Sequence, residues 1–379
     1  MTKKQNIALL PQGLKDLLPN ESRDEYSVVE SLMKTFHHFG YEIVKPPLVE
    51  FEESMFANVG RDLRQNMFQF IDPLSKKTLF IRSDMTIQMA RIATSRMKNN
   101  NRPLRLSYQG EILRVQGNQL RPERQFTQAG FELIGIRSHY ADIEVIGLAI
   151  ESLKKTGINN LSIDITLPNL IPIVTQGMNL SKKDSIIVRE LLDRKDLVKL
   201  KDIITKEKNK ILSLLVKAVG PLDNGLDILY SLDLGKEVKS ILNSTSQITS
   251  AIKKNFPDVD LTIDPSESRG FEYHDGLSFT VFARDVRGEL GRGGRYTNSN
   301  GESCSGFSVY LDSVMRAVNI SYEPKRVLVT PEINKKVLND LHNQGWVTVS
   351  TLENDLDLKK EAIRFSCSYF IDNNKPKPV

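Results

Sequence analysis

The spacing of apolar residues changes several times along the chain, and each change predicts a new element. Residues 21–39 carry apolar side chains at helical spacing: Val29, Leu32, Met33 and Phe36. Asn20 is the expected N-cap, and Gly40 stands where a glycine commonly follows the last helical turn. The first predicted element is therefore a long amphipathic helix.

Strands and helices alternate over the next part of the chain. Two consecutive prolines exclude a helix from residues 41–50, which predicts an extended segment there. Residues 76–97 predict a strand that runs into a helix, with Ser83 or Asp84 as its cap. Period-two alternation then predicts an antiparallel pair of strands over 103–115 and 124–135, followed by a helix over 140–156 and a short strand over 161–166.

The composition and the spacing of apolar residues change over residues 168–257. Leucine, isoleucine, lysine and aspartate dominate this block at helical spacing, and residues 181–184 resemble a capping box. We interpret the block as a helical insertion. Strand alternation returns over 261–285, where Asp275-Gly276 predicts a hairpin turn.

The remaining sequence predicts the end of one domain and a small second one. Residues 288–296 favour a glycine-rich turn, and residues 306–318 a strand that enters a helix. The stretch from 326 to 372 predicts a β-α-β-α order. We therefore expect a main domain over 1–320, interrupted by the insertion at 168–257, and a small α/β unit over 325–379.

Composition narrows the class of protein. The 379 residues are 40% hydrophobic and 26% charged, with a formal net charge of +5, as in an ordinary globular protein. The mild positive charge fits either an anionic partner or a slightly lysine-rich solvated surface. Only Cys304 and Cys367 occur, without the spacing of a metal site, and no apolar run reaches membrane-spanning length. We expect a cytoplasmic protein with no metal, cofactor or membrane contact.

The segment 124–135 carries the clearest candidate for binding chemistry. In a strand, alternate residues share a face, so one face carries Arg124, Phe126, Gln128, Gly130 and Glu132. A glutamine and a glutamate beside a glycine suit a cationic amine or imidazole that approaches closely. The same pattern also fits a solvent-facing sheet surface with cross-strand ion pairs. The residues alone leave both interpretations open.

Several motifs, taken in order, resemble the class II core of histidyl-tRNA synthetase. They are the helix–strand–proline unit near the start, the arginine-led loop into "RQFTQAGFELIG", "RGFEYH", "GGRY" and "GFSVYLD". The resemblance covers roughly residues 9–320. It implies an α+β fold with a mixed, mostly antiparallel sheet flanked by helices, a helical insertion and a small C-terminal α/β unit. It also implies a dimer through the first motif.

The resemblance also places candidate histidine-binding residues. Asp84 and Thr86 fall at the contact to the amine of histidine, and Arg114 falls on the arginine of the second motif. Gln128 and Glu132 fall on the two histidine-binding side chains of the second strand of that motif. The histidine-specific segment supplies the remaining three candidates, Arg269, Tyr273 and His274.

The exchanges at Asp84 and His274 depart from the synthetase pattern within the amino-acid pocket, and two further departures concern the nucleotide. The second motif is Arg-x-Glu in the synthetase, but Gln116 stands here in place of the carboxylate that orients the adenine amine. The third motif is Gly-x-Glu-Arg, but here Asp312-Ser313 ends it, so the arginine that clamps the γ-phosphate is absent. Loss of one such donor costs about 10²–10³ in rate. The tail is also short for an anticodon-binding domain.

The sequence keeps the residues of an amino-acid site but lacks the arginine that clamps the nucleotide. In this combination it resembles the regulatory subunits of ATP phosphoribosyltransferase, which are paralogues of the synthetase. This resemblance implies a non-catalytic subunit in a hetero-octamer with the short-form catalytic subunit, at the first step of histidine biosynthesis. It implies histidine as ligand, a part in feedback inhibition, and no nucleic-acid partner. The alternative is a divergent synthetase-like enzyme that activates histidine.

Overall fold

The computed structural model describes residues 9–56, 64, 66–117, 121–178, 180–267, 274–284, 286–319, 324–353 and 356–379. Its contacts divide the chain into two compact units, Met1–Asn319 and Ile320–Val379.

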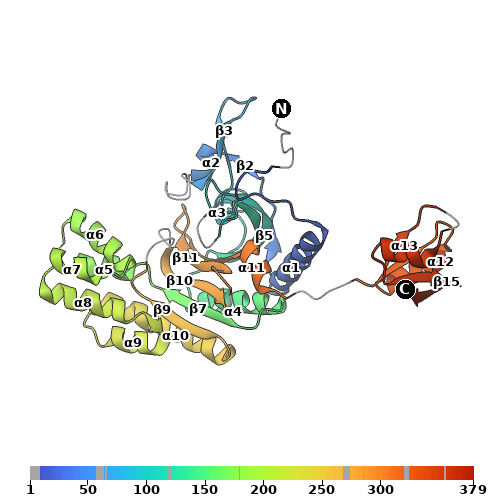
Figure 1. Ribbon diagram of the computed structural model, residues 1–379. Helices are drawn as coiled ribbons and strands as arrows, with labels where there is room; N and C mark the ends of the chain where they lie inside the picture. The colour runs from blue at the N-terminus through green and yellow to red at the C-terminus, as the bar shows by residue number, and fades with distance from the viewer. Residues whose placement is uncertain are drawn as a thin grey trace, which may run out of the picture. The chain divides into compact units, whose positions relative to one another are not determined.

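The first unit is built on a large mixed sheet (Figure 1). Among the described residues the sheet has nine strands in the order β1-β5-β6-β12-β11-β10-β7-β9-β8, and most neighbours are antiparallel. The strands are β1 (Glu42–Ile43), β5 (Leu104–Leu113), β6 (Gln125–Ile134), β7 (Leu161–Thr166), β8 (Gly220–Pro221), β9 (Asp260–Asp264), β10 (His274–Ala283), β11 (Gly291–Thr297) and β12 (Ser303–Tyr310). The mixed sheet and flanking helices confirm the expected α+β class II fold.

Helices cover both faces of this sheet. α1 (Pro19–His38) and α4 (His139–Lys155) pack against one face, where Phe131 contacts the rings of Phe36 and Tyr41. α3 (Thr86–Ser95) packs against the opposite face through a core that includes Met89 and Tyr108. Along β6, Ala129, Phe131 and Leu133 therefore lie on the face toward α1 and α4, and the opposite face is the one that carries Gln128 and Glu132.

Helix ends agree with the predictions only in part. Gly40 has φ +82° and follows α1 as expected. The N-cap of α1 is Leu18 rather than Asn20, because Pro19 takes the first helical position, where its missing N–H costs nothing. The N-cap of α3 is Met85, although Asp84 still accepts a hydrogen bond from the Thr86 amide at 2.8 Å.

A run of helices lies between β7 and β9. They are α5 (Leu170–Gln176), α6 (Lys182–Asp193), α7 (Leu197–Ile203), α8 (Lys206–Lys217), α9 (Leu222–Tyr230) and α10 (Gly235–Asn255). The capping residue Ser181 accepts a 3.0 Å hydrogen bond from the Asp184 amide, as its motif predicted. Lys195 fastens this run to the sheet by a 2.7 Å ion pair with Asp264 of β9.

Two turn predictions are wrong. Asp275-Gly276 lies inside β10, and residues 291–296 form most of β11. The glycines serve close packing within strands: a Cβ on Gly293 would lie 2.5 Å from the Gly306 carbonyl, and one on Gly276 would lie 2.8 Å from the Arg295 side chain. β12 then enters α11 (Leu311–Ala317) as predicted.

The second unit is a small α/β layer structure. Its sheet has the order β14-β13-β15-β16, with β13 parallel to both neighbours. Its elements are β13 (Arg326–Val329), α12 (Lys335–Asn343), β14 (Val347–Ser350), α13 (Leu358–Arg364), β15 (Tyr369–Asp372) and β16 (Lys375–Pro378). The β-α-β-α order is confirmed, but the last helix ends at Arg364, and residues 369–372, predicted as part of it, form β15. β16 then follows.

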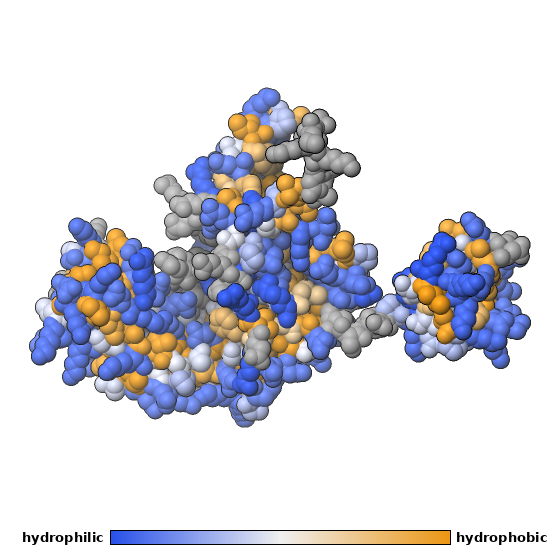
Figure 2. Space-filling view, viewed as in Figure 1, coloured by the Kyte–Doolittle hydropathy of each residue, from blue (hydrophilic) through white to orange (hydrophobic). Residues whose placement is uncertain are grey.

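A three-stranded sheet in the first unit exposes large apolar side chains. It consists of β2 (Val49–Phe51), β4 (Thr78–Ile81) and β3 (Gln69–Ile71), next to α2 (Glu52–Phe56). Ile71 is 68% exposed, Phe51 and Phe70 are partly exposed, and Leu74, in the turn that follows β3, is 92% exposed. Figure 2 shows apolar surface on this part of the first unit. No helix among the described residues is long and apolar enough to cross a membrane. Cys304 and Cys367 are buried and unpaired with each other.

Candidate functional site

The polar face of β6 is closed off from solvent. Gln128 is 0% exposed and Glu132 is 1% exposed. A solvent-facing sheet surface is therefore the wrong interpretation of this face. Because buried polar groups need partners, the contacts of these two side chains show what the face is built to hold.

Gln128 links three segments that are distant in the sequence. Its carbonyl oxygen accepts a 2.9 Å hydrogen bond from the Met85 amide at the start of α3. Its amide nitrogen donates to Asp84 Oδ2 at 3.1 Å and to Ser308 Oγ of β12 at 2.9 Å. The glutamine thereby fixes Asp84, whose carboxylate is one of the expected amine contacts.

Glu132 is a buried acid that no arginine or lysine neutralises among the described contacts. Tyr296 of β11 donates a 3.1 Å hydrogen bond to its Oε2 atom, and Thr86 also bonds to the carboxyl group. Burial outweighs these bonds and raises the pKa of Glu132 from 4.5 to about 8. Near neutral pH this face therefore holds a protonated acid that can share its proton with a ligand.

Glycines leave room around this carboxyl group. Glu132, Gly306 and Gly294 stand opposite one another on β6, β12 and β11. A Cβ on Gly306 would lie 2.1 Å from Glu132 Oε2, so the carboxyl group lies over this glycine. A Cβ on Gly130 would lie 2.5 Å from the Tyr108 hydroxyl. Glycine is needed at both places because a side chain would displace the polar groups.

His274 lies on the same face, beyond Gly294. It pairs with Tyr296 across β10 and β11, and its ring lies 2.7 Å from the position of a Cβ on Gly294. Burial, and then the nearby charge of Arg292, lowers its pKa to about 3, so the imidazole is neutral.

Arg114 lies in a neighbouring part of the face rather than among these residues. Its guanidinium lies 5.1 Å from the centre of the Phe126 ring and 5.5 Å from that of Tyr310. The structure thus brings Asp84, Thr86, Gln128 and Glu132 together, and reaches His274 through Tyr296. Arg269 and Tyr273 lie outside the described residues.

Three residues of the site were not predicted from the sequence to belong to it: Tyr108, Tyr296 and Ser308. The Tyr108 hydroxyl and Ser308 Oγ lie 2.9 Å apart, and Thr86 Oγ1 lies within 3.4 Å of both. The only signal for them is their alternation within apolar strands, because their meeting depends on the pairing of β5, β6, β12 and β11.

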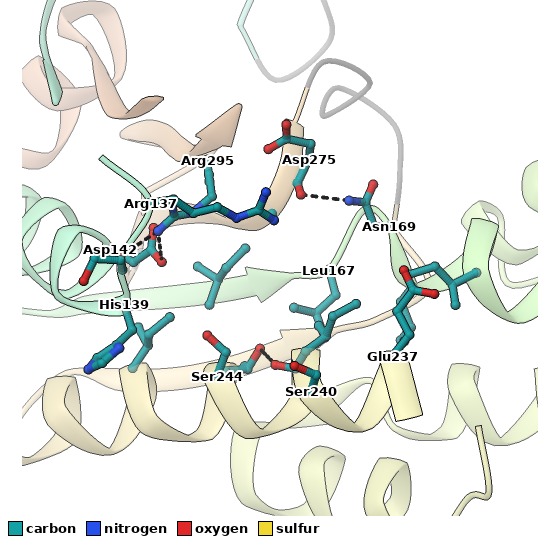
Figure 3. A pocket seen from close by; sticks show the side chains of 18 residues that line it. Arg137, His139, Asp142, Leu167, Asn169, Glu237, Ser240, Ser244, Asp275 and Arg295 are labelled. Carbon is teal, nitrogen blue, oxygen red and sulfur yellow. Dashed lines mark hydrogen bonds and ion pairs between the residues drawn. The ribbon is translucent and has the colours of Figure 1, made fainter. Parts of the chain in front are cut away.

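A separate cavity of about 590 Å³ lies against the opposite face of the sheet (Figure 3). Arg137, Asp275 and Asn169 line one side of it, and Glu237, Ser240 and Ser244 of α10 line the other. Arg295 is fixed at its wall by a 2.6 Å ion pair with Asp142. Of the predicted histidine-binding residues that the structure describes, none lines this cavity. The described residues contain no group of three or more acidic, histidine or cysteine side chains placed to hold a metal ion.

Comparisons with known proteins connect this geometry to a family. The family model described as histidyl-tRNA synthetase matches residues 13–314. An ATP phosphoribosyltransferase regulatory subunit from Rhodospirillum centenum is 45% identical, covering 96% of this chain and 94% of that protein. One of the same name from Paramagnetospirillum magneticum is 42% identical, covering 97% of each.

Solved structures agree on the fold. A Bacillus halodurans structure described as an ATP phosphoribosyltransferase regulatory subunit/histidyl-tRNA synthetase superposes with a TM-score of 0.83 at 22% identity, covering 95% of this chain and 97% of that one. A histidyl-tRNA synthetase from Nostoc sp. PCC 7120 gives a TM-score of 0.79 at 18% identity, covering 96% and 91%.

Proposed function

This chain belongs to the family of ATP phosphoribosyltransferase regulatory subunits, which has the histidyl-tRNA synthetase fold, and from this we propose that it senses histidine for a catalytic partner. The role is regulatory and lies in histidine biosynthesis. The partner in this proposal is the short-form catalytic subunit, which the chain switches on within a cytoplasmic hetero-octamer. Histidine bound by the chain would then convey feedback inhibition.

One observation carries the ligand assignment: the buried carboxyl group of Glu132, which no cationic side chain among the described residues neutralises, lies near the Asp84 carboxylate. A protonated Glu132 can donate to a neutral imidazole, or the same proton can sit on the ring. Asp84, held by Gln128 at 3.1 Å, offers a carboxylate to the α-ammonium group. Two acidic groups for two nitrogen functions match free histidine better than an apolar amino acid.

The contacts at the third motif argue against the alternative of a histidine-activating enzyme. Ser313, at the position of the phosphate-clamping arginine, is 0% exposed and accepts a 2.9 Å hydrogen bond from Arg316. A serine held in this way cannot supply a fixed positive charge to a reacting phosphate.

Homodimerisation through the class II core is part of the proposal. The exposed apolar side chains of the β2-β4-β3 sheet support it, because contiguous exposed apolar surface commonly marks an interface. Replacing Ile71 and Leu74 by lysine should shift the mass measured by light scattering toward the monomer. An unchanged mass would place the interface elsewhere.

The function is tested by reconstitution. The purified chain, added to a short-form catalytic subunit, should raise the rate of phosphoribosyl transfer to ATP, and histidine should lower the raised rate. The chain alone should show no histidine-dependent exchange of pyrophosphate into ATP. An unchanged rate would contradict the regulatory proposal, and exchange by the chain alone would establish the enzyme alternative.

A further inference from the structure

Next to the histidine pocket, one arginine is buried among rings and acids. Arg121, from the loop between β5 and β6, is 2% exposed. Its guanidinium carbon lies 3.9 Å from the centre of the Tyr310 ring and 4.5 Å from that of Phe126. Both distances are within the range of a cation–π contact, so the planar group lies against two aromatic side chains.

The edge of the same guanidinium is bound by carboxylates. Asp312 of α11 accepts two hydrogen bonds, from Nε at 3.0 Å and from Nη2 at 3.2 Å, and Glu289 accepts one from Nη1 at 3.3 Å. The Asp312 side chain is 3% exposed. A bidentate ion pair of this kind holds the guanidinium in one orientation. We call the site that Tyr310, Phe126, Asp312 and Glu289 form around Arg121 the slot.

A second ion pair joins the same loop to the same helix. Glu123 accepts a 3.4 Å hydrogen bond from Arg316, which also bonds to Ser313. Arg121 of the loop thus pairs with Asp312 of α11, and Arg316 of α11 pairs with Glu123 of the loop. The two pairs of opposite polarity hold the loop against α11.

The slot lies where the family resemblance places nucleotide contacts. Arg114 faces the same two rings, and Ser313 directly follows Asp312. The third-motif pattern Gly-x-Glu-Arg also sets Tyr310 at the position of the glycine, so a ring 6% exposed stands where the synthetase has no side chain.

We propose that Arg121 is a resident ligand of this slot, closing the chain to nucleotides with its own side chain. A guanidinium presents a π-face to aromatic rings and an N–H edge to carboxylates, as an aminopurine does. In this proposal the nucleotide site has lost its phosphate-binding arginine at Ser313, and the side chain of Arg121 also occupies it. This inference concerns a ligand other than histidine, so it stands or fails separately from histidine sensing.

The test is titration with the fluorescent nucleotide mant-ATP. The unmodified chain should show no saturable binding at millimolar nucleotide. The double variant Arg121→Ala/Asp312→Asn, which empties the slot without leaving Asp312 charged, should bind at least about tenfold more tightly. Guanidinium chloride should compete with this binding, whereas sodium chloride at equal concentration should not. Arg124→Ala is the matched control, because this arginine of the same loop contacts the carbonyls of Arg114 and Gln12 instead, and it should bind no nucleotide.

Saturable binding by the unmodified chain would overturn the proposal, and so would a folded double variant that binds no better. If the double variant does not fold, Asp312→Asn alone gives a second measurement. Hydrogen exchange at residues 121–124 should then accelerate while that of residues 104–112 stays the same. Unchanged exchange at 121–124 would also overturn the proposal.

Discussion

The Tyr296 hydroxyl donates a 3.1 Å hydrogen bond to Glu132 from a strand that does not pair with that of Glu132. β12 lies between the two strands, and it carries Gly306 beneath the carboxyl group. The bond can form because the intervening residue has no side chain. The candidate pocket therefore depends on one tyrosine, one glutamate and the glycine between them.

Glu132→Ala should weaken histidine binding by at least about tenfold, because the proton-sharing group for the imidazole is lost. Assembly with the catalytic subunit should be intact. Isothermal titration calorimetry measures the histidine affinity, and gel filtration measures assembly with the catalytic subunit. Gln125→Ala, on the exposed part of the same strand, is the matched control. Unchanged calorimetric affinity for Glu132→Ala would refute the assignment.

Histidine affinity should follow a bell-shaped pH profile. Between about pH 6.5, the ordinary pKa of imidazole, and the Glu132 pKa of about 8, the pair shares a single proton. Below this range both Glu132 and the imidazole are protonated, and above it neither is. In both cases the shared proton is lost, so the affinity for histidine falls. Calorimetry across pH 5.5–9, with Glu132→Gln as control, should show that the variant lacks the part of the alkaline fall that Glu132 causes. Parallel alkaline limbs would rule out this role of Glu132.

Gly306→Ala should reduce histidine binding while Glu132 is still present. The new methyl group would lie 2.1 Å from Glu132 Oε2, and the flexible carboxyl end would have to move away from Tyr296. We expect an affinity loss close to that of Glu132→Ala, with little change in the thermal midpoint. Gly177→Ala serves as control, since its Cβ would meet no atom closer than 3.6 Å. Full affinity in Gly306→Ala would show that the carboxyl position is not critical.

Glu132→Gln should stabilise the fold in a pH-dependent way. The native pKa of Glu132 is about 8 and its ordinary value is 4.5, so the native state keeps a proton that the unfolded state releases between these values. Stability therefore falls as pH rises from about 4.5 to 8, and glutamine avoids this loss. Thermal unfolding should show a gain of several degrees at pH 8 that nearly vanishes at pH 4.5. A gain independent of pH would mean that the titration of Glu132 is not its source.

The sequence predicted the parts of the site that depend on one strand. Alternation along 124–135 placed Gln128 and Glu132 on one face and Phe131 on the other, as observed. It could not show that Tyr296 and Ser308 meet them, because that depends on the register of β6, β12 and β11. The same register explains the two wrong turns: glycines at 276 and 291–294 serve close contacts between strands, and local sequence signals do not distinguish these from turns.

Gly130, Gly294 and Gly306 contribute no side-chain atoms to the candidate site, and a Cβ at each would lie less than 3 Å from a polar or ring atom of the site. A relative could keep every acid, amide and hydroxyl of the site and still lose its ligand through one added methyl group. When relatives are compared for histidine sensing, these three positions therefore carry as much information as the polar residues around them.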